Sequence, residues 1–267
     1  MKRFFFVVLA VLSWSVAAQD AEEVARPWSN SLELGAAWTS GNTETNNFNF
    51  KNVYQYKFEK GIFSLKAGAL RAETTDFTFR AVGNEVVVEK ETRQTDEKYS
   101  LNLKYEHEVS KKFFWFTGLD WEKNEFAGIK NRTSVSLGVG NVWADSERTK
   151  FRTDYGVQYT NEEAVFEPAG FDDSYGSIRV SYKLEQKIGA NADFSQDFVA
   201  STNFDETSDF RVNLGNKLST GITKKLALSV GLDFIYDHQP AVVPVGNLTH
   251  ELEELDTVFT TSLVINF

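Results

Sequence analysis

The sequence predicts an all-β protein, a 12-stranded antiparallel transmembrane β-barrel, and three observations indicate this fold. Apolar and polar residues alternate along most of the chain, with the period of two that a β-strand produces. The links between the alternating segments are by turns short and long, as in barrels that have short turns at one rim and longer loops at the other. The chain ends on an amphipathic segment with an aromatic carboxy-terminus, Phe267.

The first residues predict export. Lys2 and Arg3 precede an apolar run, which is followed by small residues up to Ala18. This order is typical of a secretory signal peptide, which we expect over residues 1–18. Residues 19–30 are polar and are expected to form a periplasmic lead before a barrel domain over 31–267. Because the chain has no cysteine, neither a lipoprotein anchor nor a disulfide framework is expected.

The composition fits a barrel wall. A spanning helix needs about 20 consecutive apolar residues, and no such stretch follows residue 18. A barrel strand shows only every second residue to lipid, so a mean hydropathy of −0.34 is compatible with a membrane protein. The 23 Phe, 9 Tyr and 6 Trp favour strands. A net charge of −10 argues against nucleic acid as a partner.

The first six predicted strands follow from their outward apolar residues. They are 31–39 (Leu32, Leu34, Ala36, Trp38), 47–58 (Phe48, Phe50, Tyr54, Tyr56), 63–69 (Phe63, Leu65, Ala67), 99–106 (Tyr99, Leu101, Leu103, Tyr105), 113–121 (Phe113, Trp115, Leu119, Trp121) and 134–143 (Val135, Leu137, Val139, Trp143). The intervening residues of each strand are polar or glycine in most cases, which indicates one apolar face and one wet face.

The second six repeat the pattern. They are 151–159 (Phe151, Tyr155, Val157, Tyr159), 177–184 (Ile178, Val180, Tyr182), 192–198 (Ala192, Phe194, Phe198), 210–218 (Phe210, Val212, Leu214, Leu218), 226–236 (Leu226, Leu228, Val230, Leu232) and 256–267 (Phe259, Leu263, Ile265). In the last strand, Phe267 is expected to be recognised by the barrel insertion machinery.

The lengths of the links distinguish a barrel from a soluble β-sandwich. A sandwich would show the same alternation of apolar and polar residues. Short links are expected at residues 59–61, 110–112, 144–149, 185–189 and 223–225, so that they all fall at one end. A sandwich gives no reason for that arrangement. The longest link, 73–97, resembles a small hairpin that projects outward or folds into the mouth.

The inward positions are where function is expected, and they carry charges of both signs. The lumen-lining candidates are Glu33, Lys51, Lys66, Lys104, Glu106, Asp120, Arg152, Asp154, Arg179, Lys183, Asp193, Arg211, Lys217 and Asp233. A strongly selective pore is expected to show a ring of one sign. Two hypotheses therefore stay open: a narrow channel for small solutes or ions, or a structural barrel whose lumen is closed by salt bridges.

Other chemistry has little support. The three histidines, His107, His238 and His250, belong to no recognisable catalytic motif, and phosphate loops and metal-ligand clusters are absent from the sequence. We therefore assign no catalytic, cofactor-binding or metal-binding residues. Acidic residues in the links could attract divalent cations or bridge to lipopolysaccharide, or be merely solvated; they are Glu162, Glu163, Glu167, Asp172 and Asp173.

Several motifs in order carry a family resemblance. They are the run LELGAAWTS followed by GNTET at residues 41–45, VGNVW at 139–143, YGVQYTNEE at 155–163, IYDHQP at 235–240 and the final DTVFTTSLVINF. The sequence resembles the YdiY-like salt-induced outer membrane proteins, which are built on domain of unknown function 481. The resemblance implies a barrel in the cell outer membrane, in contact with lipid and lipopolysaccharide. It leaves the molecular activity unassigned, and its link to salt or envelope stress is regulatory.

Overall fold

The computed structural model describes residues 26–39, 43–82, 85–167, 171–245 and 248–267. The predicted signal peptide and residues 19–25 of the predicted lead lie outside the described residues. The first strand begins at Trp28, three residues earlier than expected, because residues 28–30 also pair with the second strand. No helix in the described ranges is long and apolar enough to cross a bilayer.

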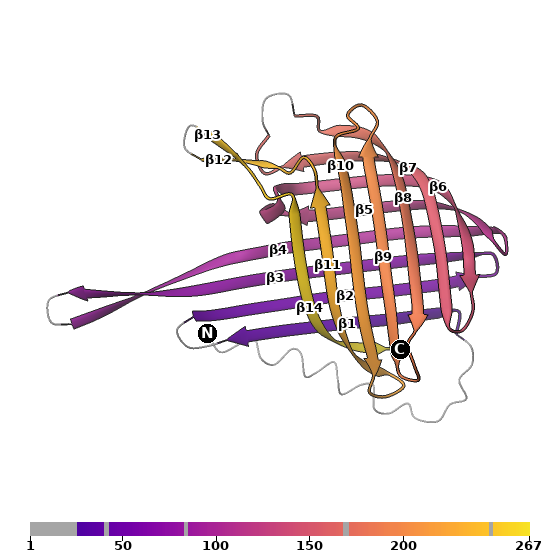
Figure 1. The fold of residues 1–267 in the computed structure, drawn as a ribbon, viewed down its shortest axis with the longest axis horizontal. Coiled ribbons are helices and arrows are strands. Elements are labelled where there is room, and N and C mark those ends of the chain that lie inside the picture. The colour runs from indigo at the N-terminus through magenta and orange to yellow at the C-terminus, as the bar shows by residue number, and fades with distance from the viewer. Residues whose placement is uncertain (1–25, 40–42, 83–84, 168–170, 246–247) are drawn as a thin grey trace.

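Twelve antiparallel strands close into one barrel, which confirms the predicted fold (Figure 1). The order around the wall is β1-β14-β11-β10-β9-β8-β7-β6-β5-β4-β3-β2. The strands are β1 (Trp28–Thr39), β2 (Thr43–Phe58), β3 (Gly61–Val82), β4 (Glu85–Ser110), β5 (Phe113–Asn124), β6 (Ile129–Asp145), β7 (Thr149–Ala164), β8 (Ser174–Lys187), β9 (Ala192–Asn203), β10 (Phe210–Gly221), β11 (Leu226–Asp237) and β14 (Leu255–Asn266).

The two faces of the wall are as the alternation predicts. Leu137 on β6 is opposite Val157 on β7, which is opposite Ile178 on β8, and all three side chains are exposed on the outside. The interior is polar, since its buried residues include Glu106, Asp154 and others of the same kind: Glu33, Ser134, Ser136, Thr160, Ser177, Ser181, Ser229 and Ser262. A soluble sandwich has the opposite distribution, with a dry apolar centre. The sandwich alternative is therefore wrong.

The five links predicted to be short lie at one rim, as predicted. They are residues 59–60, 111–112, 146–148, 188–191 and 222–225. Trp28 and Asn266, the ends of the first and last strands, lie at the same rim. We call this the inner rim and the opposite one the outer rim.

The link predicted over residues 73–97 is a continuation of the wall. β3 and β4 remain paired from Gly61 to the pair Val82 and Glu85, with a register shift between Ala72 and Glu73. This hairpin projects well beyond the barrel (Figure 1). Of the two predicted arrangements, the outward one is confirmed, and folding into the mouth is wrong because a continuous ladder keeps the ribbon in line with its strands.

The last external connection crosses the mouth. It contains β12 (Val242–Val245) and β13 (Leu248–Glu251), which pair only with each other among the described strands. Its Ala241 contacts Gly128, which ends the short 3-10 helix η1 (Glu125–Ala127) between β5 and β6. In the ring order, β11 and β14 lie opposite β5 and β6. The connection therefore spans the outer opening from one wall to the other.

Candidate functional site

The structure brings eleven of the fourteen predicted lumen residues into two groups. Six line a single cavity: Glu33, Lys51, Lys66, Lys183, Lys217 and Asp233. Five form an ionic network on another part of the wall: Lys104, Glu106, Arg152, Asp154 and Arg179. Arg211 lies at the outer mouth, Asp120 accepts a hydrogen bond from Asn102, and Asp193 is exposed near the inner rim.

The ionic network joins β4, β7 and β8. Lys104 Nζ lies 2.6 Å from Asp154 Oδ2 and 3.0 Å from Glu106 Oε1. Arg152 Nη2 lies 2.8 Å from Glu106 Oε2, and Arg179 Nη1 lies 2.9 Å from Asp154 Oδ1. Each carboxylate thus has two cationic partners, which offsets the cost of removing these charges from water. This part of the lumen is filled by side chains.

Two aromatic rings complete this packed side, and the alternation of residues in the sequence did not indicate them. Phe116 is 0% exposed and Phe114 is 3% exposed. Lys104 Nζ lies 4.5 Å from the ring centroid of Phe116, and Arg152 Cζ lies 4.6 Å from that of Phe114. A cation over an aromatic face is attracted by the ring quadrupole. The rings therefore add to the stability of the network.

Glycines on β6 and β7 make room for the rings. A Cβ on Gly138 would lie 2.7 Å from Phe116 Cε1, and one on Gly156 would lie 3.1 Å from Phe116 Cζ. A Cβ on Gly140 would collide with Phe114 Cζ. The signal available in the sequence was the run FFWF at residues 113–116, which is aromatic on both faces of its strand.

The other side of the lumen is open. A cavity of about 840 Å³ is lined mainly by β1, β2, β3, β9, β10, β11 and β14, and by the nearest residues of β4 and β8. It runs from Ser29 and Asn266 near the inner rim toward Lys98 and Ile235 near the outer rim. Its lining combines charged side chains with apolar ones such as Leu70 and Val199. It also contains the glycines Gly68, Gly215 and Gly231 and many short polar side chains, such as Asn49, Ser100, Ser195, Asn216, Ser229, Thr260 and Ser262.

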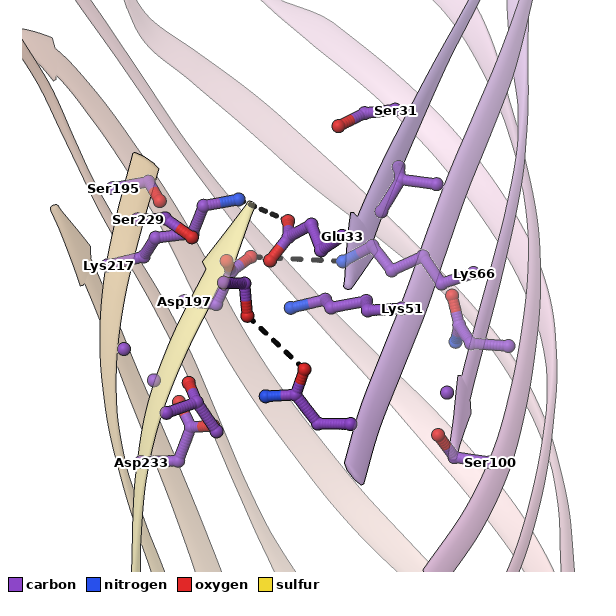
Figure 2. A pocket seen from close by; sticks show the side chains of 18 of the residues that line it. Ser31, Glu33, Lys51, Lys66, Ser100, Ser195, Asp197, Lys217, Ser229 and Asp233 are labelled. Carbon is purple, nitrogen blue, oxygen red and sulfur yellow. Dashed lines mark hydrogen bonds and ion pairs between the residues drawn. The ribbon is translucent and has the colours of Figure 1, made fainter. Parts of the chain in front are cut away.

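Ion pairs cross this open side (Figure 2). Lys217 on β10 forms an ion pair with Glu33 on β1. Lys66 Nζ on β3 lies 3.9 Å from Asp197 Oδ1 on β9. β3 and β9 are six places apart in the ring of twelve strands, so this pair spans the full width of the lumen. The two side chains therefore reach across the open path and narrow it.

A second set of charges surrounds the outer mouth. Arg132 forms two hydrogen bonds with Glu162, at 2.7 and 3.0 Å, and Tyr175 donates one to Glu162 at 3.4 Å. Arg211 bonds to Tyr175 and, at 2.8 Å, to Asp237. A pocket of about 270 Å³ lies between this band and the last connection.

This band corrects one expectation. Glu162 was predicted in an acidic external link, where it could attract cations. The structure places it on β7, 7% exposed, with its carboxylate bound to Arg132. Strand pairing extends further up the wall than the sequence pattern indicated, so the residue points inward. Within the described ranges, no group of three or more His, Asp or Glu side chains could hold a metal ion.

The histidines lie apart from the cavity. His107 belongs to an aromatic group with Tyr105 and Trp115 near the inner rim. His238 stacks on Phe210 and lies 3.0 Å from the hydroxyl of Tyr236, at the outer rim. His250 is exposed on β13. These positions give no histidine a place in the lumen.

Comparisons with known proteins agree with the sequence resemblance. The model of a family described as "Protein of unknown function, DUF481" matches residues 32–267. A search of curated proteins finds no match.

Solved structures of similar shape include an outer membrane channel from Pseudomonas putida F1, at 10% identity and a TM-score of 0.46, covering 94% of this chain and 100% of that one. A KdgM porin is similar at 8% identity and a TM-score of 0.45, covering 90% and 99%. The translocator domain of the autotransporter NalP from Neisseria meningitidis is similar at 10% identity and a TM-score of 0.41, covering 97% and 93%. All three identities are too low to transfer a function.

Proposed function

The chain belongs to the DUF481 family of proteins of unknown function, and we propose that it is an outer-membrane barrel that passes small polar solutes or ions through the open side of its lumen. The observation that carries this proposal is the cavity of about 840 Å³, whose lining includes charged and short polar side chains and which follows the wall from near one rim toward the other.

The outer surface supports a membrane location. Phe259 is 66% exposed and Leu137 is 57% exposed, and apolar residues of the same parity surround the barrel: Leu119, Val135, Val139, Val157, Ile178, Val180, Leu218, Leu228, Val230 and Leu232. Soluble monomers rarely expose so large an apolar surface. A closed barrel also leaves no strand edge unpaired in hydrocarbon, where each unsatisfied backbone group costs several kcal/mol.

Aromatic residues gather at two levels of this surface. Phe58, Tyr105 and Trp115 contact one another or their neighbours near the inner rim, and Phe210, Tyr236 and His238 form a second group near the outer rim. Amphipathic rings at both interfaces are typical of outer-membrane barrels. In this location the partners are lipid and lipopolysaccharide, and the insertion machinery recognises Phe267.

The character of the cavity supports weakly selective transport. Short polar side chains and glycines leave its centre unfilled, and lysines and carboxylates occur on it in nearly equal number. A pore that strongly selects one ion is expected to carry a ring of one sign. We therefore expect conduction of both cations and anions.

A structural barrel with a closed lumen is the second candidate. The packed side, the bridge between Lys66 and Asp197 and the connection over the mouth favour it. The two candidates differ in whether water and solutes pass the cavity, so they can be separated by direct measurement.

Single-cysteine labelling tests the proposal well because the natural chain has no cysteine. Thr260 lines the cavity, whereas Ser136 is 3% exposed on the packed side. We expect the unmodified protein to conduct in planar bilayers, and a small charged thiol reagent to reduce the current of the Thr260→Cys variant and not that of Ser136→Cys. Absence of conductance under conditions in which a known porin conducts would favour the structural barrel.

A further inference from the structure

One cation and one anion in the open cavity have no partner among the residues that the structure describes. Four of its lysines have one: Lys66 with Asp197, Lys98 with Glu122, Lys183 with Glu185 and Lys217 with Glu33. Lys51 forms no hydrogen bond or ion pair with any residue that the structure describes. The same holds for the carboxylate of Asp233, whereas Glu33, Glu185 and Asp197 are each bound to a lysine.

The two unpartnered groups share one space. Lys51 lies on β2 and Asp233 lies on β11, with only β1 and β14 between these strands in the wall. Among the described residues, the two form no ion pair with each other. Figure 2 shows Lys51 reaching into the cavity from one side and Asp233 lying on the other. The space between them is therefore flanked by opposite charges.

Glycines keep that space free of side chains. Gly68 on β3 is directly opposite Lys51, and Gly215 on β10 is directly opposite Asp233. A Cβ on Gly215 would lie 2.9 Å from Asp233 Oδ1 and would displace the carboxylate. Thr260 and Ser262 on β14 line the cavity between the two charges and can exchange hydrogen bonds with a ligand.

A charge in a partly enclosed site loses part of its hydration, and an oppositely charged partner offsets that cost. A ligand that satisfies both Lys51 and Asp233 must carry both signs. We propose that this cavity binds a small zwitterion, with its carboxylate on Lys51 and its ammonium on Asp233. The class includes amino acids and other compounds with one ammonium and one carboxylate group.

This inference rests on the proposed function for the route by which the ligand arrives, but binding itself requires no passage through the barrel. The cavity volume of about 840 Å³ is sufficient for such a molecule together with water. A purely anionic ligand would use Lys51 alone, and a purely cationic one would use Asp233 alone. Zwitterionic, anionic and cationic ligands therefore predict different effects of substituting Lys51 and of substituting Asp233.

The test measures equilibrium binding of three probes to the purified full-length barrel in detergent. Glycine is the zwitterion, glycolate has only its carboxylate, and ethanolamine has only its ammonium. We expect glycine to bind at least about tenfold more tightly than either of the others, since one additional charge-assisted contact is worth about 1.4 kcal/mol or more. Equal affinity for glycine and glycolate, or for glycine and ethanolamine, would overturn the proposal.

Two substitutions assign the ends of the ligand. Lys51→Met is expected to weaken glycine binding by about tenfold and to leave ethanolamine unchanged, and Asp233→Asn to weaken glycine to the same extent and leave glycolate unchanged. Lys111→Met and Asp145→Asn, which remove equivalent charges at the inner rim, are the matched controls and should leave glycine binding unchanged. Neither lumen substitution leaves a former partner unpaired, so both variants are expected to fold.

Folding is checked by the shift of unheated barrel on gel electrophoresis. The double variant Lys51→Asp with Asp233→Lys exchanges the two charges and is expected to recover glycine binding. If only one of the single substitutions affects glycine binding, the site is one for a simple anion or cation and the inference fails.

Conductance in potassium chloride, recorded on the same protein, tests the channel separately. Glycine binding without conductance would overturn the channel alone, and conductance without glycine preference would overturn the zwitterion site alone.

Discussion

Lys66 and Asp197 form an ion pair at 3.9 Å although they belong to strands on opposite sides of the ring, β3 and β9. Pairs between neighbouring strands stabilise a wall, whereas this pair joins two walls. On one side of it lie Lys104, Glu106 and Asp154, packed with two phenylalanine rings. On the other side lies the open cavity. The lumen is thus divided along its length into a packed part and a hollow part.

Removal of this bridge is expected to widen the conducting path. In Lys66→Met the ion pair is lost, and conductance should rise, with a change in unfolding free energy of about 1 kcal/mol or less because both side chains are nearly half exposed. Lys98→Met, which removes a lysine paired with Glu122 toward the outer rim, is the control. Equal conductance of Lys66→Met and the unmodified protein would show that the constriction lies elsewhere.

The ionic network on the packed side is expected to contribute strongly to stability. Asp154→Asn leaves Lys104 and Arg179 without their shared carboxylate, and breaking such a buried pair costs about 3 kcal/mol. Glu163→Gln breaks the pair with Lys130, whose side chains are 51% and 62% exposed, and should cost about 1 kcal/mol or less. Urea unfolding in lipid vesicles measures both. Similar losses in the two variants would contradict a stabilising network.

The glycines behind the aromatic rings are expected to tolerate no side chain. In Gly138→Val the new methyl groups would meet Phe116 and the carbonyl of Tyr155, and overpacking of this kind costs about 1–3 kcal/mol. Gly68→Val lies on the open side, where a Cβ would meet only the Ser100 hydroxyl at 2.8 Å and the Phe50 carbonyl at 3.9 Å. We expect thermal stability to fall clearly in the first variant and little in the second. A larger loss of thermal stability in Gly68→Val than in Gly138→Val would contradict the assignment of the packed side to the region around Phe116.

The connection over the mouth is expected to open when its contact is removed. Gly128 and Gly189 both have positive φ, 77° and 84°, so alanine introduces backbone strain of about 1 kcal/mol at either position. Only at Gly128 would the added Cβ collide with Ala241, since Gly189 has no neighbour within 4 Å. Gly128→Ala should therefore increase conductance and protease cleavage within residues 238–254, and Gly189→Ala should change neither. Identical behaviour of the two variants would rule out a closing role.

The carboxy-terminal residue is expected to act in assembly rather than in stability. Phe267 is 49% exposed, and its backbone N–H donates to the Asn30 carbonyl at 3.0 Å. Deletion of Phe267 should lower the amount of barrel in the outer membrane of producing cells. Phe259→Ala removes another exposed ring from the same strand and should leave that amount unchanged. Equal loss in both variants would point to a general effect on β14.

The alternation of residues was sufficient to predict the closed antiparallel barrel because side chains on a strand must point to opposite faces. It also placed Leu137, Val157 and Ile178 on the outside correctly. It did not indicate Phe114 and Phe116, because the strand that carries them is apolar on both faces, and the deciding factor is the glycine surface of the neighbouring strands. Residues in adjoining links were harder to place, as Glu162 shows, because the point at which pairing stops depends on both partners.

The residue pattern of single strands also could not predict which interior charges form ion pairs with each other. Lys66 and Asp197 are far apart in sequence and meet only because the ring brings β3 opposite β9. The sequence alone predicted that positive and negative charges in the lumen nearly balance. It did not predict that Lys51 and Asp233 lack ion-pair partners, because that depends on which lysine reaches which carboxylate. The division of the lumen into packed and open parts is likewise a property of the assembled ring.

The ends of the chain meet at the shortest seam of the barrel. Among the described residues, β1 pairs with β14 only from Ser31 to Leu34, whereas every other pair of neighbouring strands in the barrel is joined at 11 or more positions. A barrel is expected to open first where the fewest backbone pairs join two strands, so on pulling or heating β1 and β14 are expected to separate first. The product would be a single curled sheet bordered by the first and last strands. Closure of the same seam would then be the final step of folding.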